Sequence, residues 1–192
     1  MPARRCTSST PAGVRSPGEA VDSTTSPEAG AAPRRPDARF LRAKLSHFVA
    51  LGFGSGLSPL GPGTVGTLWA WLVFAVAADW LAPRHWAIVL VLAFALGIWA
   101  CGRTARDLGV DDHGAIVWDE IVAFWLVLLF VPGGWLAQLG AFVVFRFFDI
   151  VKPPPIRHYD ASLKGGFGVM FDDLLAALYT LFVIAVASRL AA

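Results

Sequence analysis

The feature that most constrains this chain is a series of apolar stretches long enough to cross a lipid bilayer. They cover residues 64 to 82, 85 to 102, 115 to 148 and 171 to 188. Because about 20 helical residues span the ~30 Å of hydrocarbon, the third stretch can hold two helices, broken at residues 132 to 134 (Pro-Gly-Gly). The sequence therefore predicts an all-α, polytopic membrane helical bundle with about four to five transmembrane or re-entrant helices.

The composition agrees with a membrane protein. Hydrophobic residues make up 56% of the chain, the mean hydropathy is +0.59, and only 16% of residues are charged, against about a quarter in soluble proteins. A net charge of +2 and a basic leader without aromatic residues give no reason to expect a nucleic-acid partner. Cys6 and Cys101 have no partner at motif spacing, so neither a disulfide framework nor a zinc site follows.

The first 40 residues differ in composition from the rest of the chain. They are rich in Pro, Ser, Thr, Ala and Arg, and hold few large apolar side chains. Such a segment cannot bury enough surface to offset its ordering entropy, and it lacks the apolar core of a secretory signal. The sequence predicts a disordered cytoplasmic tail over residues 1–40 and a membrane-embedded domain over residues 41–192.

Charge is distributed unevenly along the predicted spans. With a cytoplasmic N-terminus, the loops at 103 to 114 and 149 to 170 face the cytoplasm, and they carry five basic residues where the outer loops carry only Arg84. This bias satisfies the positive-inside rule. Most acids beyond the tail fall in the same inner loops or in the adjoining span ends: Asp111, Asp112, Asp119, Glu120, Asp149, Asp160, Asp172 and Asp173.

The segment DDHGAIVWDE, residues 111 to 120, places acids in an apolar setting. If the third span begins near residue 115, Asp119 and Glu120 lie one turn inside it, where a carboxylate is costly unless it is paired or bound to a cation. Asp112 shares their face if the helix extends that far. The pair could also be a snorkelling interfacial pair, but the cluster favours a functional role.

A second cluster is FRFFDIVKPPPIRHYD, residues 145 to 160. Arg146, Asp149 and Lys152 are spaced so that they follow one side of a helix, which the prolines after Lys152 then end. Asp149 could ligate a metal while the basic residues hold an anionic headgroup. A salt-bridged helix end before a stiff linker explains the same pattern equally well.

Two glycine-rich segments complete the pattern. In GGFGVMFDD, Gly165 and Gly166 could let backbone N–H groups approach a phosphate, which Asp172 and Asp173 would repel unless a divalent cation lay between them. In GFGSGLSPLGPGTVGTLWA, residues 52 to 70, glycines and hydroxyls could contact a phosphate headgroup, or form only a flexible entry loop. The candidate contacts in the second segment are Gly63, Thr64, Gly66 and Thr67.

GLSPLGPGTVGTLWA, DHGAIVWDE, FRFFDIVKPPPI and GGFGVMFDD, in this order, resemble the bacterial phosphatidylglycerophosphatase A family over residues 45 to 190. The resemblance implies a multi-pass inner-membrane enzyme, a phosphoric monoester hydrolase dependent on Mg²⁺. Its substrate in the bilayer would be phosphatidylglycerophosphate, and its product phosphatidylglycerol, used directly or for cardiolipin. The N-terminus and active site would be cytoplasmic. Oligomeric state stays open.

The resemblance also assigns roles to residues. It implies catalytic carboxylates at Asp112, Asp119, Glu120, Asp149, Asp172 and Asp173. We expect Mg²⁺ to be held by Asp119, Glu120, Asp172 and Asp173, with Asp112 or Asp149 in support. Lys152, carried over from the family, and Arg146 would balance charge on the phosphate oxygens. Direct attack by water and prior phosphorylation of an aspartate both remain open.

Two other functions deserve comparison. A related lipid phosphatase acting on phosphatidic acid or a prenyl phosphate would use the same residues. A small cation transporter would need ionisable side chains near the middle of its spans, where this sequence has none. The one-sided arrangement of acids favours an enzyme at a single membrane face.

Overall fold

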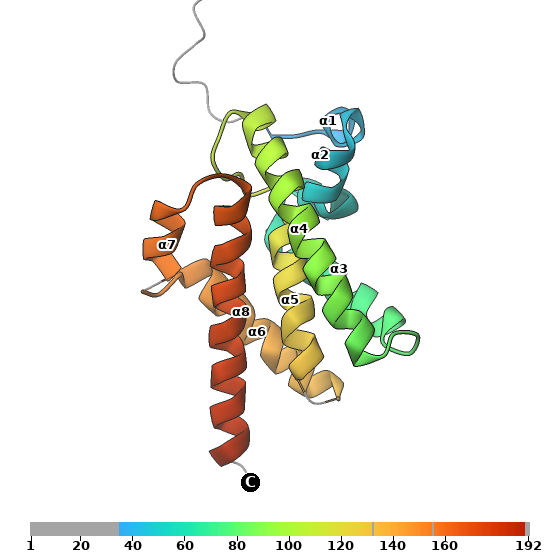
Figure 1. Cartoon of the computed structure of the whole chain (residues 1–192), viewed down its shortest axis with the longest axis vertical. Helices are drawn as coiled ribbons and strands as arrows, with labels where there is room; N and C mark the ends of the chain where they lie inside the picture. Colours follow the sequence, from blue (N-terminus) through green and yellow to red (C-terminus); the bar gives the residue numbers. More distant parts are fainter. Residues whose placement is uncertain (1–34, 132, 155, 191–192) are drawn as a thin grey trace, which may run out of the picture. The chain divides into compact units, whose positions relative to one another are not determined.

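The computed structural model describes residues 35–131, 133–154 and 156–190, and regular structure in these residues is entirely helical (Figure 1). The predicted all-α class is confirmed for this part of the chain. The helices in chain order are α1 (Ala38–Ala43), α2 (Leu45–Ala50), the 3₁₀ helix η1 (Gly52–Leu57), α3 (Pro62–Ala77), α4 (Pro83–Leu108), α5 (Trp118–Phe130), α6 (Trp135–Val151), α7 (Ile156–Ser162) and α8 (Gly165–Leu190).

Five apolar helices, α3, α4, α5, α6 and α8, follow the predicted stretches in order. The helices α4 and α8 have 26 residues each, and each contains an 18-residue window with a mean hydropathy of 2.0, so by length and composition they could cross a membrane. The other three have 16, 13 and 17 residues, fewer than the about 20 needed for an upright crossing. The break predicted at residues 132 to 134 falls between α5 and α6.

Two helix starts differ from those expected, and both differences move acids relative to their helices. Helix α5 begins at Trp118 rather than near residue 115, because Val117 has a non-helical backbone (φ −137°) and its N–H donates to Ala50 O of α2 (2.9 Å). Asp112 therefore lies in the loop and not on a face of α5. Helix α8 begins at Gly165, so Asp172 lies about two turns inside it.

Helix α5 forms the centre of the bundle. It contacts α3, α4, α6 and α8, and side chains on all its sides are buried, as expected for a helix that is apolar all round. Two tryptophans tie it to its neighbours: Trp118 Nε1 donates to Ala93 O of α4 (3.0 Å), and Trp125 Nε1 donates to Ala70 O of α3 (2.9 Å). These bonds satisfy indole N–H groups that would otherwise be buried without partners.

Helices α4 and α8 cross where both carry glycine. A Cβ on Gly102 would lie 3.0 Å from Gly166 N, and a Cβ on Gly166 would overlap Ile98 O. Gly166 thus permits close contact between backbones, as small residues commonly do between membrane helices. Gly165 has φ +75°, a left-handed conformation that suits glycine at the start of α8.

A buried histidine in α2 links α1 and α2 to the C-terminal end of α4. His47 is 2% exposed and stacks on Phe40, with ring centroids 3.8 Å apart. Its Nδ1 lies 2.8 Å from Phe40 O, and its Nε2 lies 2.9 Å from Asp107 Oδ2, which also accepts from Lys44 Nζ (2.7 Å). Helix α1 begins at Ala38, within the segment predicted as a tail; residues 1–34 of that prediction lie outside the described residues.

Candidate active site

Acidic side chains from three helices converge at one end of the bundle. Glu120 lies in the first turn of α5, Asp149 in the last turn of α6, and Asp173 in α8. Each offers one carboxylate oxygen, and these three oxygens all lie within 4.8 Å of one another. Residues that are far apart in the chain thus form a compact group with the spacing and donor type of a divalent cation site.

The carboxylates are shielded from water. Asp119 is 8% exposed and Asp173 is 2% exposed. One oxygen of each, Asp119 Oδ1 and Asp173 Oδ2, is buried and accepts no hydrogen bond from the protein, and the same holds for Glu120 Oε2. Carboxylate oxygens buried without donors are costly, and a bound cation would satisfy them. The residues present therefore fit the predicted Mg²⁺.

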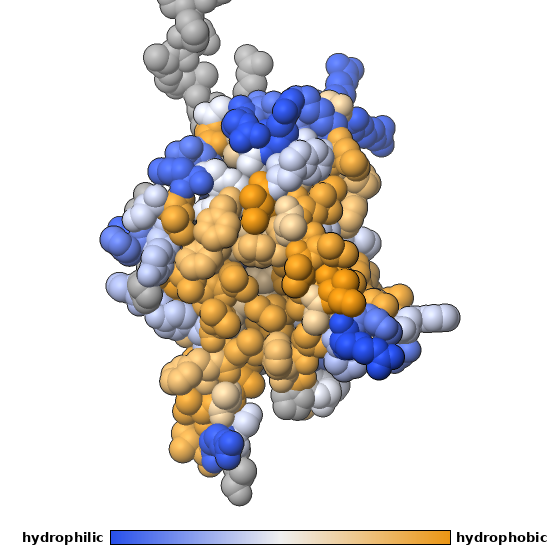
Figure 2. Space-filling view, in the orientation of Figure 1, coloured by the Kyte–Doolittle hydropathy of each residue, from blue (hydrophilic) through white to orange (hydrophobic). Residues whose placement is uncertain are grey.

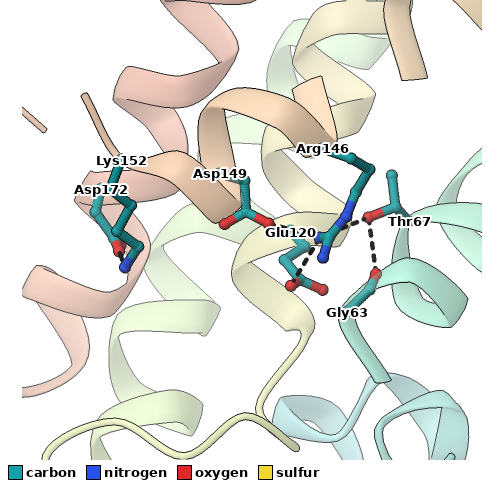
Figure 3. Close-up of polar contacts among 7 residues, drawn as sticks. All are labelled: Gly63, Thr67, Glu120, Arg146, Asp149, Lys152 and Asp172. Carbon is teal, nitrogen blue, oxygen red and sulfur yellow. Dashed lines mark hydrogen bonds and ion pairs between the residues drawn. The ribbon is translucent and has the colours of Figure 1, made fainter. Parts of the chain in front are cut away.

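Arg146 pairs with two members of this acidic group, Glu120 and Asp149 (Figure 3). Its Nη1 is 2.9 Å from Glu120 Oε1 and 2.6 Å from Asp149 Oδ2, and its side chain is only 13% exposed. It also donates a long hydrogen bond to Thr67 Oγ1 (3.5 Å), which in turn donates to Gly63 O (2.8 Å). The guanidinium offsets part of the negative charge and links α6 to α5 and α3. If Arg146 bound the substrate phosphate, as the sequence predicts, that contact would compete with these bonds.

Lys152 pairs with Asp172 of α8. Its Nζ bonds Asp172 Oδ2, and Figure 3 shows this pair to one side of Glu120 and Arg146. Lys152 follows the last residue of α6 with φ 44°, in the left-handed region. The turn that it makes before Pro153 directs its side chain towards α8.

The group that converges differs in composition from the expected metal set. Asp149, expected only in support, stands with Glu120 and Asp173. Asp119 and Asp172 remain close enough to repel the Asp173 carboxylate. Asp112 is exposed in the loop before α5 and lines a small cavity with Gly165, while its charge also acts on Asp119 and Glu120.

The glycines of α3 pack directly against the site. A Cβ on Gly63 would overlap the Glu120 carboxylate, and a Cβ on Gly66 would lie 3.3 Å from Glu120 Oε2 and 2.8 Å from Val117 Cβ. Gly63 and Gly66 are both buried, whereas Thr64 is half-buried in the first turn of α3. The two glycines thus allow α3 to lie against the acid-bearing end of α5.

Sequence reasoning missed this packing and the position of Arg146 among the acids. The signal for the packing is the spacing of Gly63 and Gly66, which puts both on one face of a helix, a common arrangement where apolar helices approach closely. The signal for Arg146 is weaker. An arginine in an apolar helix needs a buried partner, but the sequence does not say which acid supplies it.

Over the residues that the structure describes, fold and site together define a helical bundle with two bilayer-length helices and a buried group of carboxylates at one end. Residues 48–188 match the family described as Phosphatidylglycerophosphatase A. The chain belongs to this family, as its sequence segments predict.

Curated relatives cover most of the chain. A phosphatidylglycerophosphatase A of Haemophilus influenzae is 46% identical over 139 residues, which are 72% of this chain and 85% of the relative. One of Escherichia coli is 42% identical over 150 residues, 76% of this chain and 87% of the relative. A Bacteroides thetaiotaomicron protein provisionally named phosphatidylinositol-3-phosphatase is 42% identical over 148 residues, 72% and 91% of the two chains. No solved structure matches the chain.

Proposed function

We propose that this protein is a Mg²⁺-dependent lipid phosphatase that hydrolyses phosphatidylglycerophosphate to phosphatidylglycerol and phosphate at the cytoplasmic face of the bacterial inner membrane. Family membership and the names of two relatives support the reaction. The observation that carries the proposal is the group of Glu120, Asp149 and Asp173, whose carboxylate oxygens lie within 4.8 Å of one another. Carboxylates so placed suit a hard cation that also binds phosphate oxygens.

The proposed chemistry divides between the metal and the chain. Mg²⁺, when bound, would neutralise phosphate charge and help to deprotonate an attacking water. Glu120, Asp149 and Asp173 would hold the metal, with Asp119 beside them. Because Asp119 Oδ1 is buried and accepts no hydrogen bond, it can receive a proton from water or serve as a nucleophile towards phosphorus. Arg146 would limit the repulsion between these acids and the substrate.

The distribution of charge supports an enzyme that acts at one face. Acids of the site lie in the first turn of α5, in the last turn of α6 and about two turns inside α8, and residues 174 to 188 of α8 carry no charge. The last two turns of α4 carry Arg103 and Arg106, and the loop before α8 carries Lys164, which favours the cytoplasmic side. A cation transporter would need a polar path through the apolar half as well.

The specificity of the protein for the lipid headgroup can be tested by competition between lipids in detergent. The Bacteroides relative's provisional name raises a phosphoinositide as a second candidate substrate. We expect phosphatidylglycerophosphate to be hydrolysed with a kcat/KM at least about tenfold above phosphatidylinositol 3-phosphate, phosphatidic acid and a prenyl phosphate, because headgroup hydroxyls can be read by hydrogen bonds. Chelation of Mg²⁺ should stop phosphate release. Equal use of all four lipids, or release that survives chelation, would contradict the proposal.

The change Gly63→Ala tests the packing of α3 against Glu120. Since a Cβ at this position overlaps the Glu120 carboxylate, either the carboxylate or α3 must shift. A displacement of about 1 Å at a reacting centre can lower the rate by about 100-fold, so we expect phosphate release to fall by at least about tenfold. Gly140→Ala in α6 is the matched control, because a Cβ there meets nothing within 4 Å. Equal activity of both variants would refute the packing argument.

A further inference from the structure

An apolar cavity of about 230 Å³ lies between α4, α5 and α8. Its walls include Leu90 and Phe94 from α4, Leu126 from α5, and Leu174 from α8. Asp119 also lines it, and the buried Oδ1 of this residue accepts no hydrogen bond. The lining of the cavity therefore includes a carboxylate of the candidate active site.

A second apolar cavity, of about 580 Å³, continues along α5 and α8. Leu126 lines both cavities, and Phe130, Leu178 and Ile184 line the second. We call the two cavities together the α5–α8 groove. From Asp119 to Phe130 the groove follows α5 for about 16 Å, at about 1.5 Å per helical residue. One leaflet of a bilayer contributes about half of the ~30 Å hydrocarbon core, so the groove has the depth of a leaflet.

The groove opens on the apolar side of the molecule. Figure 2 shows this face as a nearly continuous hydrophobic surface, hollowed between α8 and α4. Residues at the rim are exposed: Val91 by 69% and Leu178 by 50%. In a bilayer such a face contacts lipid chains. A ligand that reaches from this face to the acidic group must be apolar along most of its length and charged at one end.

We propose that the α5–α8 groove binds one acyl chain of the lipid substrate and thereby holds the phosphate at the acidic group. This inference rests on the proposed function, since a phosphorylated lipid joins the two required chemistries in one molecule. Leu126 lies at the junction of the two cavities. A long acyl chain must pass it, whereas a short chain ends in the first cavity. Binding of a long chain therefore depends on the space beside Leu126, and binding of a short chain does not.

The kinetic test uses a bulky substitution at Leu126, where the two cavities meet. Leu126→Trp should lower kcat/KM at least about tenfold for dioleoyl phosphatidylglycerophosphate and less than about twofold for the dihexanoyl lipid, because a bulky ring excludes only the long chain. Leu178→Trp, at a position that is 50% exposed, should act in the same direction without overpacking the core. Leu92→Trp is the control: it is 64% exposed on α4 and does not line the groove. Equal losses on both lipids in folded variants would overturn the proposal.

A binding test separates this inference from the proposed function. Dioleoyl phosphatidylglycerophosphate with a photoactivatable diazirine on one chain is cross-linked to the wild-type protein in detergent, and the adducts are mapped by mass spectrometry. We expect adducts on Leu126, Leu178 and their groove neighbours, reduced at least about fivefold by Leu126→Trp because the ring takes the space of the chain. Adducts spread evenly over the apolar face would overturn the proposal that the groove binds an acyl chain, even if the lipid is hydrolysed. Groove adducts without hydrolysis would instead reject the proposed activity alone.

Discussion

Asp173→Asn is expected to lower phosphate release by at least about 100-fold, because it removes a charged oxygen from the proposed metal site. Asp173 is 2% exposed, and it stands with Glu120 and Asp149 in the compact group of carboxylates. An asparagine fits the same space, but its neutral amide oxygen is a weaker ligand for Mg²⁺. The measurement is phosphate release from phosphatidylglycerophosphate in detergent at saturating Mg²⁺.

The same variant gives a second result that does not depend on activity. The Asp173 carboxylate is repelled by the charges of Asp149, Asp119, Asp172 and Glu120, so neutralising it should leave the metal-free melting temperature unchanged or raise it. The increase in melting temperature that Mg²⁺ gives the wild type should be lost, because a ligand stabilises only a state that binds it.

The matched control for Asp173→Asn is an aspartate away from the acidic group. Asp79 is exposed just beyond the C-terminal end of α3, so Asp79→Asn should keep both the activity and the Mg²⁺-dependent rise in melting temperature. If Asp173→Asn retains near-normal activity together with the thermal response to Mg²⁺, the assignment of Asp173 to the metal site is wrong.

Arg146→Met should have the largest effect on stability. Its Nη1 lies 2.9 Å from Glu120 Oε1 and 2.6 Å from Asp149 Oδ2, and all three side chains are nearly buried. A methionine fills much of the same volume but leaves both carboxylates without their cation. Removing one partner of a buried ion pair costs about 3–5 kcal/mol, and we expect the free energy of unfolding, measured by denaturant titration in detergent, to fall by about this amount.

Two further variants identify charge as the cause of the loss. Arg146→Lys retains a cation and should lose less stability, although lysine cannot reproduce the planar fork of the guanidinium. The double variant Arg146→Met with Glu120→Gln should be more stable than Arg146→Met alone, because one of the uncompensated charges is gone. If Arg146→Met unfolds at the same denaturant concentration as the wild type, the arginine is not needed to stabilise the buried Glu120 and Asp149 carboxylates.

Much of the architecture could be read from local sequence. Long apolar runs predict the helices α4 and α8, and the break after Phe130 separates α5 from α6 as expected. The start of α5 was less predictable. Apolar residues 115 to 117 read as part of a helix, but they lie outside it because Val117 N–H bonds to Ala50 O in α2. A contact with a distant segment thus overrides the local pattern.

The candidate site was predicted in composition and only partly in arrangement. The carboxylates Glu120 and Asp173 stand together as expected, and Asp149 joins them, whereas Lys152 pairs with Asp172. Gly63 and Gly66 were predicted to contact a phosphate; the structure adds that a side chain at Gly63 would overlap the Glu120 carboxylate and one at Gly66 would overlap Val117. Which acid meets which base depends on where separate helices cross, and spacing along a single helix does not contain that information.

The sequence by itself determined the helical class, the family and the clustering of acids in a few short segments, because hydrophobic length and residue type act locally along the chain. Tertiary structure alone decided that Arg146 pairs with both Glu120 and Asp149. It also decided that the glycines of α3 pack against α5, and that a groove leads from Asp119 along α8. These features arise where helices distant in sequence pack against one another. Their geometry follows from shape and backbone separation, which no local pattern encodes.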